Sequence, residues 1–169
     1  MEEISLYGPG GKPAWFWKLN PRGEVPVLVC QVGDVVLPDS DLILDEIGNV
    51  LENGSKLIPD DEPTKSRIAA FRKALKEFLP VGKKAVLGGR KDEMWAKLKE
   101  LDHHIQGPYV CGDAVTIADC AGFPFLWRID KEFGPLDQNG CKNIHKWLHF
   151  CASSKAFANT VQPSWWWWW

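Results

Sequence analysis

The spacing of apolar residues changes near residue 60, and this change limits the folds open to the chain. Before it, Val25–Cys30 reads "VPVLVC", an almost wholly apolar, β-branched run typical of a buried strand. The turn residues Gly33 and Asp34 then lead to "VVLP", so we expect a hairpin between Val27–Cys30 and Val35–Leu37. After residue 60, apolar residues recur at helical spacing. A small α/β unit followed by an all-helical unit is therefore expected.

The spacing of apolar and polar residues predicts three further elements in the first unit, one strand and two helices. "EISLY", at residues 3–7, alternates polar and apolar side chains as a half-buried strand does. "PAWFWKL" suits a short helix that starts at Pro13. "DSDLILDEIGNVL" has helical spacing, with Asp39 or Ser40 at the position of the N-cap.

The second unit is predicted to hold four helices. "PDDEPTK" is a proline-containing linker, which places the boundary between an α/β domain 1–59 and a helical domain 60–169. "TIADCAGFPFLWRI" is apolar nearly all round, as a central buried helix is, and Thr116 with Asp119 has the spacing of a capping box. The other three helices carry apolar stripes at Ile68, Phe71, Leu75, Phe78 and Leu79, at Trp95, Leu98, Leu101 and Ile105, and at Ile144, Trp147, Leu148 and Cys151.

Composition excludes several classes of protein. The net charge of −2 argues against a nucleic-acid-binding protein, and no apolar run is long enough for a transmembrane segment. Met1–Leu6 carries two glutamates and no basic residue, unlike a signal or transit peptide. The five cysteines are odd in number and show no CxxC spacing, which favours a reducing, intracellular compartment, either the cytoplasm or an organelle such as a plastid.

The chain ends in five consecutive tryptophans, Trp165–Trp169. Five exposed indoles make an apolar patch that soluble monomers avoid. We therefore expect the tail to pack in a cleft of its own chain, on a protein partner or at a membrane interface.

Three stretches together resemble the glutathione transferase superfamily, and in particular its omega, lambda and dehydroascorbate-reductase-like classes. They are "KPAWFWKLNPRGEVPVLV", "PDSDLILDEI" and "YVCGDAVTIADCAGFPFLWRI", in family order across residues 3–160. The resemblance implies a glutathione-transferase fold, with a truncated thioredoxin-like N-terminal domain and an all-α C-terminal domain. It also implies that Thr116 and Asp119 nucleate the central helix, so Asp119 is read as a folding residue.

The same resemblance implies a glutathione half-site. The Val25–Pro26 bond is expected to be cis, so that the backbone of Val25 meets the cysteinyl part of glutathione like an added strand. Ser40 and Asp39 are expected to receive the γ-glutamyl carboxylate and ammonium at a helix N-terminus. Lys12 is expected to reach the glycyl carboxylate. Asp39 stands where the family more often has Glu.

No catalytic residue is assigned. In the family, a strand and a helix that carry the catalytic Tyr, Ser or Cys precede the strand that "EISLY" resembles, and no residue here has a matching position. Tyr7 and Ser5 are read as ordinary strand residues. We favour a non-catalytic glutathione-binding or scaffold subunit that docks a partner through the open sheet and the Trp tail. The alternative is a glutathione-dependent transferase or thiol reductase whose catalytic segment lies outside this sequence.

Other candidate groups are assigned structural roles. Cys141, His145 and His149 share a helix face at a spacing that can hold a metal, but a polar stripe explains them as well, and no metal site is predicted. Trp15 and Trp17 are read as packing residues. The rest are read as surface: His103 and His104, and a basic loop of Lys83, Lys84, Arg90 and Lys91.

Overall fold

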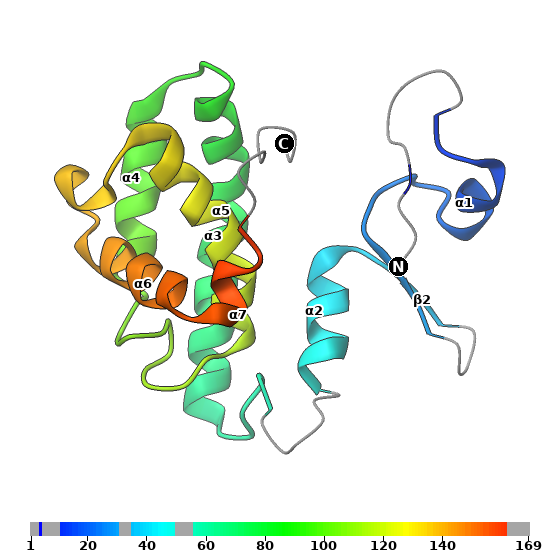
Figure 1. Ribbon diagram of the computed structural model, residues 1–169, viewed down its shortest axis with the longest axis horizontal. Coiled ribbons are helices and arrows are strands. Elements are labelled where there is room, and N and C mark those ends of the chain that lie inside the picture. Colours follow the sequence, from blue (N-terminus) through cyan, green and yellow to red (C-terminus); the bar gives the residue numbers. More distant parts are fainter. Residues whose placement is uncertain (1–3, 5–10, 31–34, 50–55, 162–169) are drawn as a thin grey trace. The chain divides into compact units, whose positions relative to one another are not determined.

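The computed structural model describes residues 4, 11–30, 35–49 and 56–161, and the chain divides into the compact units Met1–Val50 and Leu51–Trp169 (Figure 1). Each unit is described by itself. The boundary at residues 59 and 60 stays a sequence prediction.

The first unit is built on an antiparallel hairpin. Strand β1 (Val27–Val29) pairs with β2 (Val36–Pro38) in the register Val27–Pro38, Leu28–Leu37 and Val29–Val36, which confirms the predicted hairpin. Helix α1 (Ala14–Leu19) precedes the hairpin and has Pro13 at its N-cap, and helix α2 (Ser40–Asn49) follows it. Both helices lie where the sequence predicts them. The strand predicted at residues 3–7 lies outside the described residues except for Ile4.

The expectation that Val25–Cys30 forms a buried strand is wrong. Val29 is 49% exposed, and Val27 and Leu28 are only half-buried. Within the described part of this unit the sheet has two strands, so β1 has a neighbour along one edge only. The all-apolar run correctly predicts that a strand forms. Its side chains would be buried only if other elements covered both faces of the sheet.

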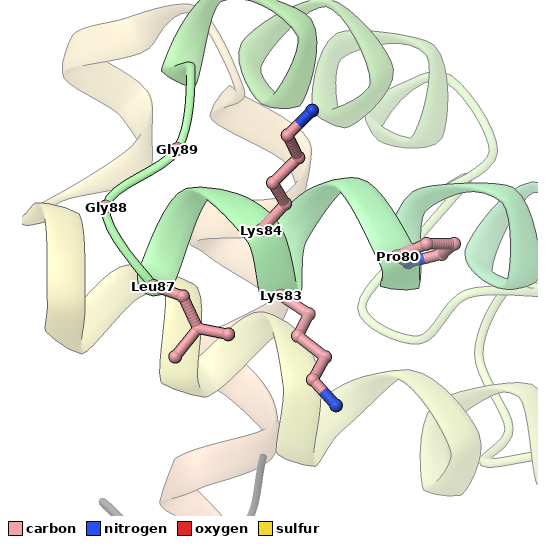
Figure 2. Close-up of a pocket in the computed structure, with 6 residues that line it drawn as sticks. All are labelled: Pro80, Lys83, Lys84, Leu87, Gly88 and Gly89. Atoms are coloured by element: carbon pink, nitrogen blue, oxygen red, sulfur yellow. The ribbon is translucent and has the colours of Figure 1, made fainter.

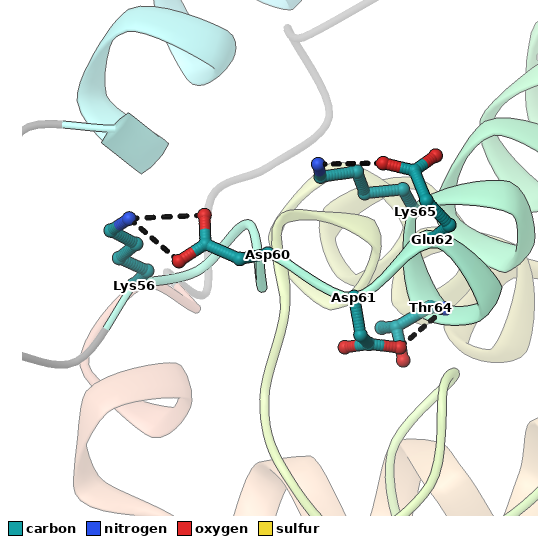
Figure 3. A network of polar contacts seen from close by, with 6 residues as sticks. All are labelled: Lys56, Asp60, Asp61, Glu62, Thr64 and Lys65. Carbon is teal, nitrogen blue, oxygen red and sulfur yellow. Dashed lines mark hydrogen bonds and ion pairs between the residues drawn. The ribbon is translucent and has the colours of Figure 1, made fainter.

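Several polar contacts cluster at the start of the first helix of the helical unit, α3 (Glu62–Val86). Asp61 is the N-cap residue, and its Oδ1 accepts a hydrogen bond of 2.9 Å from the N–H of Thr64 (Figure 3). Lys56 pairs with Asp60 at 2.9 Å, and Lys65 pairs with Glu62 at 3.0 Å. The predicted linker "PDDEPTK" extends to Lys65, but helix α3 already begins at Glu62, so the prediction is wrong for residues 62–65. The helix starts there because the Asp61 carboxylate satisfies a helix N–H and faces the positive end of the dipole.

Helix α3 continues further than the sequence indicates. Its predicted stripe is confirmed at Ile68, Phe71, Leu75 and Phe78, which are buried, and Leu79 is half-buried. The helix runs on through Pro80, so Lys83 and Lys84 lie in its last turn. Lys91 is the first residue of the next helix, so the predicted basic loop is wrong for these three lysines. The cost of an internal proline is offset by packing of the last turns, where Gly82 and Ala85 are buried.

Five helical elements follow and close a bundle on α3. They are α4 (Lys91–Asp102), α5 (Ile117–Phe133), the 3-10 helix η2 (Leu136–Asn139), α6 (Lys142–Ser153) and α7 (Lys155–Ala158). Helix α3 packs on α4 and α5, and α6 packs on α4, α5, η2 and α7 (Figure 1). None of residues 117–130 is exposed, which confirms α5 as the central helix.

The capping box at the start of α5 is also confirmed. Asp119 is fully buried, and its Oδ2 accepts the N–H of Thr116 at 2.8 Å. Its Oδ1 accepts the N–H of Val110 and the indole Nε1–H of Trp147, both at 2.8 Å. Asp119 therefore joins α5 to α6 and to the loop before α5, as a structural residue.

Candidate functional site

The hairpin brings together two of the segments that the sequence analysis singles out. The β1–β2 register ends at Val27 and Pro38, and one step beyond it the N–H of Asp39 donates to the carbonyl of Pro26 at 3.4 Å. Val25 and Pro26, which lead into β1, therefore lie beside Asp39 and Ser40, which follow β2 and begin α2.

Val25 presents an open backbone at this end of the hairpin. Its peptide bond to Pro26 is cis, and the residue is 44% exposed. Among the described residues, none forms a hydrogen bond with its N–H or its C=O. An unpaired donor and acceptor on an extended segment suit a peptide that adds as a further strand.

The N-terminus of α2 is capped by Asp39, which resolves the choice between Asp39 and Ser40. The Asp39 Oδ1 accepts the N–H of Asp41 at 2.8 Å, and Ser40 is the first residue of the helix. Asp39 has φ of 110°, a sparsely populated region for a residue with a side chain, and such backbone is concentrated at ligand-binding positions. Its second carboxylate oxygen and the Ser40 hydroxyl are both on exposed residues.

Lys12 does not stand alone in solvent. Its Nζ lies over the ring of Trp17, 5.5 Å from the centroid, at the range of a cation–π contact. Trp17 in turn lies over the backbone at Gly23, because a Cβ built there would be 2.5 Å from Trp17 Cζ3. The prediction that Trp17 is a packing residue is therefore incomplete, since its ring also holds a cation.

The loop between α1 and β1 is fixed by a residue that the sequence analysis missed. Asn20 is buried; its Nδ2 donates to the carbonyl of Glu24 at 2.8 Å, and its Oδ1 accepts the N–H of Arg22 at 3.2 Å. The "NPRG" letters were a usable signal, because an Asn side chain commonly bonds the backbone two residues on in a turn.

The cysteines of the helical unit are poor nucleophiles. Burial, the largest cause, raises the pKa of Cys120 and Cys141 to about 11 and that of Cys151 to about 12. Burial also raises the pKa of Cys111. These thiols are neutral at physiological pH, and a thiol attacks as its thiolate.

Other candidate residues gain no role in ligand binding. Among residues 11–30, 35–49 and 56–161 no cluster of His, Cys, Asp and Glu is arranged to hold a metal. Cys141 is fully buried, and the ring of His145 packs edge-on against that of His149 with 4.5 Å between centroids. Ser5, Tyr7 and the tail Trp165–Trp169 lie outside the described residues. The assignment of the first two as ordinary strand residues and partner docking at the tail therefore stay predictions.

A hollow at the C-terminal end of α3 is a surface feature only. It is lined by Pro80, Lys83, Lys84, Leu87, Gly88 and Gly89, and the two lysine side chains point in different directions (Figure 2). Both lysines are exposed, and Leu87 is exposed as well. No helix in the described part of the chain is long and apolar enough to cross a membrane.

Comparisons with known proteins agree on one family. Residues 1–50 match the family profile "Glutathione S-transferase, N-terminal domain", and residues 67–149 match "Glutathione S-transferase, C-terminal domain". The chain is 30% identical over 158 residues to the probable glutathione S-transferase DHAR4 of Arabidopsis thaliana, covering 88% of this chain and 71% of that protein. It is 24% identical to the probable glutathione S-transferase DHAR2, chloroplastic, of Oryza sativa subsp. japonica, covering 94% of this chain and 58% of that protein.

Solved structures share the fold. The trimeric glutathione transferase TDR1 of Leishmania superposes with a TM-score of 0.79 at 22% identity, over 95% of this chain and 39% of that one. Glutathione transferase Omega 3C from Trametes versicolor superposes with a TM-score of 0.76 at 17% identity, over 96% and 77%. The fold predicted from the sequence is confirmed.

Proposed function

Because the chain belongs to the glutathione S-transferase superfamily, we propose that its first unit binds glutathione at the end of the β1–β2 hairpin. The proposed site consists of five residues: Lys12, Val25, Pro26, Asp39 and Ser40. The observation that carries the proposal is the bond from Asp39 N–H to the Pro26 carbonyl, because it sets the open backbone of Val25 beside the N-terminus of α2.

Each part of glutathione has a matching group. The cysteinyl residue adds to the N–H and C=O of Val25 as a short extra strand. The γ-glutamyl carboxylate is received at the start of α2, where helix N–H groups and the Ser40 hydroxyl are donors. The free Asp39 carboxylate oxygen faces the γ-glutamyl ammonium, and Lys12 pairs with the glycyl carboxylate.

Thiol activation is a separate matter from binding. The described residues of the helical unit offer only cysteines with raised pKa values, so they supply no thiolate. The first proposal is therefore a glutathione-binding or accessory protein. The second is a glutathione-dependent transferase or thiol reductase, which the names of the Arabidopsis and rice relatives favour, with its thiol-activating residue outside the described ranges.

Calorimetric titration with reduced glutathione tests the binding proposal. Ser40→Ala removes one hydrogen bond to a charged group and should weaken binding about tenfold. Ser66→Ala, the same change at an exposed position of α3, is the matched control and should bind as the parent does. Absence of binding by the parent chain, or equal binding by the parent and Ser40→Ala, would overturn the site.

An activity assay separates the two functions. The chain is mixed with glutathione and dehydroascorbate, and ascorbate formation is followed by its absorbance. Binding without turnover supports the accessory protein. Turnover that is lost in Ser40→Ala and kept in Ser66→Ala supports the enzyme.

A further inference from the structure

Three residues of the first unit form a contact cluster, Lys12, Trp17 and Gly23, that the proposed binding chemistry does not require. The Lys12 ammonium lies over the Trp17 ring, and the backbone of Gly23 lies against the same ring at Cζ3 and Cη2. Trp17 is 46% exposed, so burial of its indole in a core does not explain its position.

Gly23 makes the contact between the ring and the loop possible. A Cβ at this position would lie 2.5 Å from Cζ3 and 2.6 Å from Cη2 of Trp17, closer than carbon atoms approach. The residue also has φ of 68°, which glycine adopts at little cost. A side chain at position 23 would therefore displace the indole.

The loop that contains Gly23 is held by hydrogen bonds of its own. The two hydrogen bonds of the buried Asn20, to Glu24 and Arg22, fix the turn that contains Gly23. Because the same turn leads into Val25, the Trp17 ring contacts the loop that precedes β1.

The contact between Lys12 and Trp17 restrains a flexible cation. A lysine side chain loses much rotamer freedom when it binds, and a contact that orders it beforehand lowers that loss. The ring attracts the ammonium through its π face and uses none of the N–H groups that point away from it. Those N–H groups stay available to a carboxylate.

We propose that Trp17 is a positioning residue that holds the Lys12 ammonium ready for the glycyl carboxylate, and that Gly23 admits its ring. The inference rests on the proposed function, since it assigns the partner of Lys12. It makes Trp17 a determinant of specificity for a free carboxylate at the C-terminal end of the tripeptide.

The test compares two ligands by calorimetry: glutathione, and glutathione monoethyl ester, in which the glycyl carboxylate is blocked. The parent chain should bind glutathione more tightly than the ester. Trp17→Leu should weaken glutathione binding about two- to fivefold, the range of an exposed cation–π contact, and leave ester binding unchanged. Trp17→Phe keeps a ring and should recover part of the preference.

A double-mutant cycle shows whether Trp17 acts through Lys12. Lys12→Ala should abolish the preference, and Lys12→Ala with Trp17→Leu should be no weaker than Lys12→Ala alone. Trp15→Leu is the matched control, because Trp15 is 45% exposed on the same helix and its ring contact is with Phe16. Gly23→Ala adds a Cβ against the Trp17 ring, so it should displace the ring and reduce the preference while both Lys12 and Trp17 remain.

The outcomes separate the two claims. If the parent chain binds neither ligand, the proposed function fails and the inference fails with it. If the parent prefers glutathione and Trp17→Leu keeps that preference in full, or Trp15→Leu loses it equally, only the inference is overturned.

Discussion

Replacement of Asp119 by alanine should be among the most damaging single changes in the helical unit. The carboxylate is fully buried and accepts from the N–H of Val110, the N–H of Thr116 and the indole N–H of Trp147, each at 2.8 Å. Alanine leaves these three N–H donors without an acceptor, together with the Thr116 hydroxyl, which donates to Oδ2 at 3.1 Å. The loss of stability therefore comes mainly from buried donors without an acceptor, and less from the lost contacts themselves.

The magnitude follows from the cost of a buried unsatisfied donor, about 1–3 kcal/mol each. The three N–H donors, with partial relief from water entering the space left by the carboxylate and a hydroxyl that can rotate to another partner, give a loss of about 3–5 kcal/mol. Whole domains are stable by about 5–15 kcal/mol, so Asp119→Ala should unfold a large share of the molecules under mild denaturing conditions.

Urea titration followed by circular dichroism at 222 nm measures this loss. Trp147→Phe removes one of the three donors and should cost about 1–2 kcal/mol. Asp113→Ala removes an exposed carboxylate from the loop before α5, and should stay within about 0.5 kcal/mol of the parent. A loss below about 1 kcal/mol for Asp119→Ala, or equal losses for it and Asp113→Ala, would refute the reasoning.

Two further predictions concern packing and thiol ionisation. Gly122→Ala should cost about 1–3 kcal/mol in the same titration, because a Cβ there would lie 2.8 Å from the Phe71 ring; an unchanged midpoint would contradict this. Burial raises the pKa of Cys141 to about 11 and of Cys151 to about 12, from 9.0 for a free thiol. The unfolded chain therefore loses these protons first as the pH rises, and the free energy of unfolding should fall between pH 9 and 12, with Cys151→Ala reducing the slope. Both thiols should react with a disulfide reagent at pH 8 only after denaturation, and rapid reaction in the folded chain would oppose the assignment.

Local sequence patterns predict much of the helical unit because they depend on neighbours along the chain. The stripe from Ile68 to Phe78 repeats at helical spacing, and the Thr116–Asp119 box spans one turn. The end of α3 cannot be predicted in this way. A local rule ends the helix before Pro80, but packing around Gly82 and Ala85 stabilises α3 as far as Val86.

The sequence by itself determined the family, the hairpin, the four main helices and the residues of the glutathione half-site as a prediction, because each depends on short-range spacing or on motif order. The tertiary structure decided which of Asp39 and Ser40 caps α2, that the backbone of Val25 lies beside that cap, and that the Trp17 ring contacts both Lys12 and Gly23. It also decided that Asp119 bonds Trp147, 28 residues away along the chain. These pairings depend on where side chains meet once the chain has folded, and periodicity along the sequence carries no record of that.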